Sequence, residues 1–333
     1  MITVAWLRLP IHIASLILFT FSFLVTFFVT PKLIKYLKQA GITGKDMNKK
    51  DKPKVAEMGG LAIIVGFCAS LLPSIGVTRG ETLVHLLGIL SVTLIVTIIG
   101  ILDDILGWKR GIRQWQHALL PIFASFPLIA LRAGEHTMNL PFMGPTNFGI
   151  LYPLILIPLG ITGASNAVNM LGGMNGLRMS LCGIISFSLG LVGLHTGDVL
   201  VSSISFSLTG AILAFLYFNW YPAEVFPGDT GTLGVGAIIA SIVIIGNIEK
   251  TGVLLFTLFF VELILKARSK FQAENWGQIQ EDGTLKPRYK KSYSLTQATM
   301  KLGQNFGGFT EKQVATSIII LQALIAVFTL III

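Results

Sequence analysis

Long apolar runs separated by short polar segments fill most of this chain, and no other feature restricts its fold as strongly. A helix that crosses a bilayer needs about 20 mostly apolar residues, and the sequence offers about ten such runs. With 53% hydrophobic and only 12% charged residues, the composition is that of a multi-pass membrane protein. We therefore predict an all-α polytopic fold, a single integral-membrane domain over residues 1–333. The predicted spans are roughly Ile11–Tyr36, Gly59–Val77, Thr82–Leu102, Trp115–Leu131, Phe148–Ser165, Leu177–Leu194, Val199–Phe218, Thr232–Ile245, Gly252–Leu265 and Gln313–Ile333.

Basic residues are divided unequally between the two sides of such a bundle. The loops that would face one side hold 21 of the 25 Lys and Arg residues, whereas Arg8, Arg79, Arg132 and Lys250 fall on the other. Because Lys and Arg are retained on the cytoplasmic side of short loops, we predict both termini outside and residues 266–312 as a large cytoplasmic loop. The same charges either set the topology alone or also meet an anionic substrate or lipid headgroup. No small-residue cleavage site follows the first run, so we expect no removed signal peptide.

Several function classes lack their sequence patterns here. Cys68 and Cys182 lie inside predicted spans without CxxC spacing, and the five histidines are scattered, so no zinc site is indicated. The chain has no Walker loop, no GxGxxG after a strand and no serine elbow. We expect no nucleic-acid partner.

The remaining polar residues gather near helix ends on the predicted cytoplasmic side. Asp103 and Asp104 would close the third span, where adjacent acids repel each other and oppose the helix dipole, so a purely structural role fits them poorly. Asn166 and Asn169 lie three apart on one helical face and, with Asn175 beyond a Gly-Gly break, suggest a built site. A transporter would more often place its acids at mid-membrane in broken helices. The full set is Glu57, Asp103, Asp104, Asn166, Asn169, Asn175 and Asp229.

The stretch FPGDT puts Gly228 and Asp229 at the start of another apolar run. An acid just before a helix caps it, and this explains Asp229 by itself. It does not explain the other carboxylate and amide groups beside basic loops. Mg²⁺ prefers such oxygens and usually binds through one or two carboxylates together with substrate phosphates. The sequence therefore predicts a magnesium site, with Mn²⁺ as a substitute, and a phosphate or diphosphate partner.

Five blocks, spaced between the predicted spans, carry a resemblance to a known family. They read GKDMNKKDKPKVAEMGG, GILDDILGWKRG, NAVNMLGGMNGL, YFNWYPAEVFPGDT and EDGTLKPRYKKS, of which NWYPxxVFxGDT is specific. In this order they resemble the polyprenyl-phosphate N-acetylhexosamine-1-phosphate transferases over nearly the whole chain. The archaeal form of the dolichyl-phosphate GlcNAc-1-phosphotransferases is the nearest branch.

The resemblance implies a reaction and a location. GlcNAc-1-phosphate would pass from UDP-GlcNAc to a polyprenyl (dolichyl) phosphate, giving GlcNAc-PP-polyprenol and UMP, the first lipid-linked step of N-glycan or surface-glycan assembly. The alternatives are the same reaction with another UDP-N-acetylhexosamine and, from another class, a secondary transporter. The site would face the cytoplasm from the cell membrane in an archaeon or from the endoplasmic reticulum in a eukaryote. The oligomeric state, including a homodimer, stays open.

The family's functional residues carry over onto matching positions only. The resemblance assigns Asn169 and Asp229 to the Mg²⁺ on the donor diphosphate, and Phe226 to stacking on uracil. From its place in the asparagine cluster we add Asn166. The last cytoplasmic loop offers Arg268 and Lys270 for the sugar phosphate. The remaining assignments are Asn175 and Gly173 at the uracil edge, Met47 closing the same pocket, and Glu57 near the sugar.

The role of the acidic pair Asp103-Asp104 in that family is disputed between activation of the lipid phosphate and positioning of the metal and diphosphate. A phosphomonoester has a second pKa of about 6, so the lipid phosphate is already largely anionic at neutral pH. The harder task is to bring two anions together, and we therefore favour positioning.

The sequence departs from the family pattern at two places. Members usually carry a Lys shortly after the acidic pair, but the segment Gly111–Leu120 offers Arg113 and His117 and no Lys. Arg178 stands where an acid often follows the NGL block, so no acidic role carries over to it.

Overall fold

The computed structural model describes residues 10–110, 114–140 and 144–333. Helices follow one another with only short strands between them. The helices are α1 (Ile11–Gln39), α2 (Leu61–Val77), α3 (Gly80–Arg110), α4 (Gln114–Leu119), the 3-10 segment η1 (Leu120–Ser125), α5 (Phe126–Ala130), the π-helical segment η2 (Tyr152–Leu156), α6 (Ile157–Met170), α7 (Leu177–Thr196), α8 (Val199–Asn219), α9 (Gly228–Ile245), α10 (Glu249–Leu255), α11 (Thr257–Ala267), α12 (Leu295–Gly303), the 3-10 segment η3 (Gln304–Phe306) and α13 (Glu311–Ile332). The strands are β1 (Thr43–Lys45), β2 (Lys54–Ala56), β3 (Thr137–Leu140), β4 (Gly144–Asn147), β5 (Gln278–Ile279), β6 (Thr284–Lys286) and β7 (Phe309–Thr310).

The predicted all-α polytopic fold is confirmed. Among the described residues, seven helical segments are long and apolar enough to cross a membrane: α1, α3 as far as Leu106, η2 with α6, α7, α8, α9 and α13. Two of the ten expected spans are interrupted. The span Trp115–Leu131 is divided among α4, η1 and α5, where Pro121 and Pro127 remove backbone donors, and Gly252–Leu265 is divided between α10 and α11. The number of spans stays a prediction.

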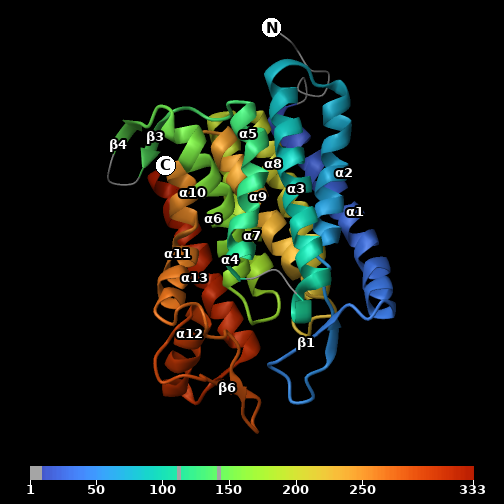
Figure 1. Ribbon diagram of the computed structural model, residues 1–333, viewed down its shortest axis with the longest axis vertical. Helices are drawn as coiled ribbons and strands as arrows, with labels where there is room; N and C mark the ends of the chain where they lie inside the picture. The colour runs from blue at the N-terminus through green and yellow to red at the C-terminus, as the bar shows by residue number, and fades with distance from the viewer. Residues whose placement is uncertain (1–9, 111–113, 141–143) are drawn as a thin grey trace.

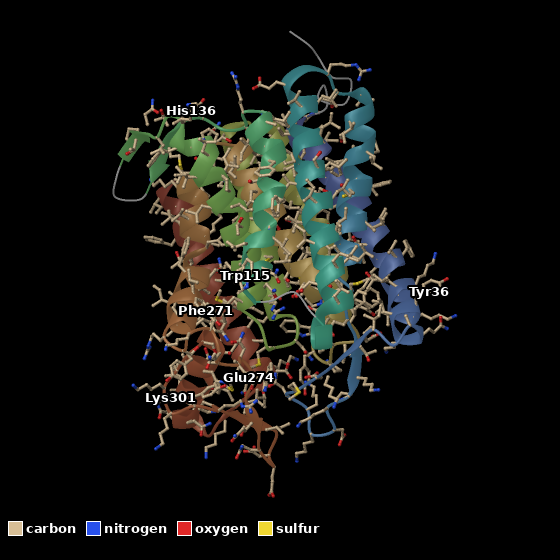
Figure 2. All side chains as sticks on the ribbon, in the orientation of Figure 1. Tyr36, Trp115, His136, Phe271, Glu274 and Lys301 are labelled. Atoms are coloured by element: carbon tan, nitrogen blue, oxygen red, sulfur yellow. The ribbon has the colours of Figure 1, made fainter. Side chains whose placement is uncertain are left out.

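The two ends of the bundle carry different loops (Figure 1). α1 begins and α13 ends toward the end where β3 and β4 lie, whereas β1, β6 and α12 lie at the opposite end. Figure 2 shows Glu274 and Lys301 at this second end and His136 at the first. The basic segments 32–58 and 266–312 therefore share one end, as the predicted topology requires. Which side of the membrane that end faces stays a prediction.

The helix α9 is the most buried of the seven and packs against both α3 and α6. Small residues permit this close packing. A Cβ added at Gly100 of α3 would lie 2.5 Å from the Cα of Thr230, and one at Gly236 of α9 would lie 2.5 Å from the carbonyl oxygen of Ala164. The start of α9 is thereby fixed against α3, and its middle against α6.

A hairpin and a loop from distant parts of the chain join at the start of α9. Strands β1 and β2 pair antiparallel, and the chain after β2 runs beside the segment that precedes α9. The backbone N–H of Phe226 donates to the carbonyl of Ala56 at 2.7 Å, and the N–H of Gly59 donates to the carbonyl of Phe226 at 2.9 Å. These bonds fix Phe226 between the hairpin and α9.

Residues 266–312 form a small substructure of their own. It contains α12 and the three-stranded antiparallel sheet β5-β6-β7, and β7 leads directly into α13. Thr310 and Gln313 form a reciprocal capping box at the start of α13, which satisfies two donors that a helix end leaves unpaired. The division of the chain into one domain with this loop inside it stays a prediction.

The packing of α9 generates a stability prediction. Gly236→Ala should lower the free energy of unfolding by about 1–3 kcal/mol, because the added methyl overlaps backbone atoms of α6. The measurement is the thermal unfolding of the detergent-purified protein. Gly76→Ala is the matched control, since a Cβ there meets no atom within 4 Å. Equal unfolding temperatures for the two variants would contradict the close approach of α9 and α6.

Candidate active site

One cavity of about 1250 Å³ brings together nearly all of the predicted site residues. Its walls come from α3, α6, α7 and α9, the β1–β2 hairpin, α11 and the segment 271–276. Arg268 and Lys270 are not among the residues that line the cavity, whereas Lys266, two residues before Arg268, is. The predicted residues on the wall are Met47, Glu57, Asp103, Asp104, Asn166, Asn169, Gly173, Asn175, Phe226 and Asp229.

Asp104 has a structural role that the sequence interpretation judged unfavourable. Its Oδ1 accepts from the backbone N–H of Asp229 at 2.8 Å, and its Oδ2 accepts from the N–H and the hydroxyl of Thr230 at 2.9 and 2.6 Å. Asp104 thus caps α9 from a different helix. The objection from the helix dipole was wrong, because α3 continues to Arg110 and the acidic pair does not end it.

Asp229 is not the cap of its own helix. It is the second residue of α9, and no side chain of the preceding segment caps that end. Asp104 satisfies the donors instead, so the capping interpretation of Asp229 was wrong. Gly228 has a φ of +66°, and a Cβ there would lie 2.6 Å from Oδ2 of Asp104, so a side chain is excluded by both conformation and space.

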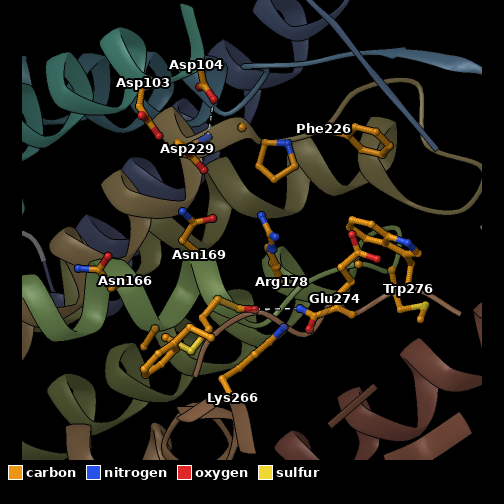
Figure 3. A pocket seen from close by; sticks show the side chains of 18 of the residues that line it. Asp103, Asp104, Asn166, Asn169, Arg178, Phe226, Asp229, Lys266, Glu274 and Trp276 are labelled. Atoms are coloured by element: carbon orange, nitrogen blue, oxygen red, sulfur yellow. Dashed lines mark hydrogen bonds between the residues drawn. The ribbon is translucent and has the colours of Figure 1, made fainter. Parts of the chain in front are cut away.

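Figure 3 shows the three aspartates on one side of the cavity, Lys266 on the other, and Arg178 between them. Asp103, Asp104 and Asp229 lie together, with Asn169 of α6 below them in this view. Asn169 and Asp229 supply one amide and one carboxylate, which fits a Mg²⁺ that also takes phosphate oxygens and water. Among the described residues no group of three or more His, Cys, Asp or Glu is placed to hold a metal ion. The magnesium site stays a prediction.

Arg178 and Lys266 are cationic wall residues to which the sequence analysis gave no role. Arg178 belongs to the first turn of α7, where a positive charge opposes the helix dipole. A basic residue at such an unfavourable position is the sequence signal that could have identified Arg178 as a site residue. Its Nε is buried and has no hydrogen-bond partner among the described residues. Such a cation beside Asp229 is suited to an anionic ligand.

Glu57 follows β2 and lies near the carboxylates. Burial raises the pKa of its carboxyl above the ordinary value, and the negative charges of Asp104 and Asp229 raise it further, while Arg178 opposes the shift. The concentration of negative charge on this wall is therefore costly without a bound cation.

Asn166 uses its amide for contacts within the protein. Its Nδ2 donates to the carbonyls of Thr162 at 2.8 Å and Ala118 at 2.9 Å, which ties the end of α4 to α6. Its assignment to substrate binding stays a prediction. Arg113 lies outside the described residues, and for His117 only the backbone, within α4, is described.

The cap formed by Asp104 leads to a second stability prediction. Asp104→Asn should lower the free energy of unfolding by about 1–3 kcal/mol, because an amide leaves at least one buried donor of α9 unsatisfied. Thermal unfolding measures this. Asp198→Asn is the matched control, since Asp198 caps α8 through a single bond of 2.9 Å to the N–H of Val201, and Asn caps equally well. A stable Asp104→Asn protein would show that the bonds to α9 are dispensable.

Comparison with known proteins places the chain in a family. The pattern of Glycosyl transferase family 4 matches residues 86–247. The chain is 39% identical to a protein of Saccharolobus solfataricus over 96% of both chains, and 38% identical to one of Sulfolobus acidocaldarius over 85% and 86%; both are provisionally named UDP-N-acetylglucosamine–dolichyl-phosphate N-acetylglucosaminephosphotransferase. A phospho-N-acetylmuramoyl-pentapeptide-transferase of Streptococcus thermophilus is 33% identical over 74% of this chain and 77% of its own. The resemblance read from the motifs is confirmed, and the chain belongs to glycosyl transferase family 4.

Proposed function

We propose that this protein transfers GlcNAc-1-phosphate from UDP-GlcNAc to dolichyl phosphate or another polyprenyl phosphate. The observation that carries the proposal is the similarity, over nearly the full length, to relatives named for this reaction. The cavity supports it, because it collects carboxylates, amides, cations and an aromatic ring from distant segments of the chain. An oxygen of the lipid phosphate attacks the phosphorus that carries the sugar, and the bond from that phosphorus to the bridging oxygen breaks, releasing UMP.

The donor is held by residues at two parts of the cavity. The uracil would lie among Phe226, Asn175, Gly173 and Met47, which all line the cavity. The aromatic ring of Phe226 offers a surface on which a pyrimidine can stack. Asn169 and Asp229 would hold Mg²⁺ on the diphosphate. When bound, the metal neutralises charge on the phosphates and stabilises the leaving UMP.

Cations and acids of the chain itself then orient the reacting phosphates. Arg178 and Lys266 offset the repulsion between the lipid phosphate and the diphosphate. Asp104 holds the start of α9 and so fixes the position of Asp229 through the backbone. Asp103 lies beside them and completes the acidic side of the cavity. No general base is needed, because the lipid phosphate is already an anion near neutral pH.

The acceptor lipid enters from the side. The cavity wall includes Trp115, Leu159 and Leu263, which are 59%, 63% and 41% exposed. The wall between α4, α6 and α11 therefore reaches the apolar surface of the bundle. A polyprenyl chain therefore stays in the bilayer while its phosphate reaches the aspartates. The site then faces the cytoplasm, the side on which the basic loops are retained.

The test is a reaction of purified protein with Mg²⁺, a short polyprenyl phosphate and separate UDP-sugars. UMP and a lipid-linked product should form with UDP-GlcNAc, and excess chelator should abolish both, with partial recovery in Mn²⁺. Another UDP-N-acetylhexosamine giving the faster reaction would change the donor and keep the chemistry. Movement of a UDP-sugar into vesicles without UMP release would establish a transporter and end the proposal.

Asp229→Asn tests the metal assignment. We expect a folded protein whose turnover falls at least about a hundredfold, on the order of 3 kcal/mol, because the substitution removes a full charge from the site that must bind Mg²⁺. Part of the loss should be recovered at high Mg²⁺. Asp51→Asn, at an exposed position of the hairpin, is the control. Near-normal turnover in the Asp229 variant would remove this residue from the metal site.

A further inference from the structure

The two residues that flank Met47 both reach the turn between α6 and α7. Asp46 accepts a hydrogen bond at its Oδ2 from Nδ2 of Asn175 at 3.0 Å. Asn48 donates from its Nδ2 to the carbonyl oxygen of Gly173 at 2.5 Å. Asp46, Asn48 and Asn175 are all buried, and Asp46, Met47, Gly173 and Asn175 line the cavity. The hairpin therefore binds Gly173 and Asn175, the two residues of this turn to which the proposed function assigns contacts with uracil.

The bond to Asp46 determines which atom Asn175 offers to a ligand. An ionised carboxylate only accepts hydrogen bonds, so the amide nitrogen of Asn175 must face Asp46. The carbonyl oxygen Oδ1 of Asn175 then faces away from Asp46 and makes no hydrogen bond to any described residue. A ligand in the cavity therefore meets the acceptor Oδ1 of Asn175, because the donor Nδ2 is already bonded to Asp46.

Other contacts keep this arrangement in place. Oδ1 of Asp46 accepts from the backbone N–H of Asn48 at 3.3 Å, and Lys49 lies 3.5 Å from Oδ2 of Asp46 while also pairing with Glu311 of α13. Glu311 in turn accepts from the backbone N–H of Asn175 at 2.8 Å. Both partners of the Asp46–Asn175 bond are thus held by further contacts, Asp46 by its own turn and Asn175 by Glu311 of α13, and Lys49 contacts both of these acids.

We propose that Asp46 is a positioning residue that selects the nucleobase of the donor. Uracil carries a hydrogen on N3, whereas cytosine has a bare acceptor nitrogen at the same position. An oxygen presented by Asn175 accepts from uracil and repels cytosine, and an unpaired buried acceptor is costly. The proposal rests on the proposed function, which places the uracil edge at Asn175.

Asp46→Asn tests the proposal by binding, without turnover. An amide at position 46 has one acceptor oxygen for the two donors of Asn48 and Asn175, so the amide of Asn175 loses its fixed orientation. We expect the affinity for UDP to fall about tenfold or more and the preference for UDP over CDP to narrow, since a reversed Asn175 donates to N3 of cytosine. Calorimetry of the detergent-purified protein with Mg²⁺ and UDP or CDP measures both.

A variant in which the side chains of residues 46 and 175 are exchanged separates an effect on nucleobase selection from an effect on folding. In Asp46→Asn/Asn175→Asp the amide of residue 46 donates to residue 175, and the second carboxylate oxygen there again faces the base. The preference for UDP should return toward that of the unaltered protein. Asp282→Asn is the control, because Asp282 forms the same type of turn through the N–H of Thr284 at 2.9 Å, at an exposed position.

The outcomes distinguish this proposal from the proposed function. Unchanged selectivity in a folded Asp46→Asn protein, or no recovery in the exchanged variant, overturns the role of Asp46 while UMP release stands. An unaltered protein that binds UDP and CDP equally overturns it as well. An unaltered protein that binds neither nucleotide and releases no UMP removes the proposed function itself.

Discussion

The carboxylate of Asp104 meets the donors at the start of α9, and the arrangement of the cavity depends on that contact. A helix that begins inside a bundle leaves backbone N–H groups that water does not reach. Here α3 supplies the missing acceptor, so α9 can begin at the floor of the cavity and not in solvent. The position of Asp229 follows from this, whereas Phe226, just before the helix, is held by backbone bonds to Ala56 and Gly59. The start of α9 is therefore fixed from two sides, by α3 and by the chain that follows the hairpin.

The site gathers charges that repel one another. Asp103, Asp104 and Asp229 lie together on one side. Burial raises the pKa of the Glu57 carboxyl, and the charges of Asp104 and Asp229 raise it further. Arg178 opposes that shift, and Lys266 adds a second cation to the wall. Such a cavity is costly for the empty protein and favourable for a ligand that combines a divalent cation with phosphates.

The fold class could be predicted from the sequence, and nearly all of the predicted site residues line the cavity, because apolar runs and short motifs are local signals. Asp229, Asn169 and Phe226 lie in such motifs and reach the cavity together. The capping role of Asp104 could not be predicted, since it joins residues 125 positions apart. The bond between Asp46 and Asn175 spans 129 positions and was missed for the same reason. Lys266 lines the cavity from the last turn of α11, whereas Arg268, the predicted residue, lies just beyond the end of that helix.

The contact between Lys49 and Glu311 connects the β1–β2 hairpin to α13. Glu311 also accepts from the backbone N–H of Asn175, so the turn between α6 and α7 is held from α13. During synthesis the helices emerge in order, and α13 emerges after α3, α6 and α9. A growing chain therefore contains the three aspartates well before Glu311 can support this turn. A chain cut short before Glu311 would keep the aspartates and lose that support.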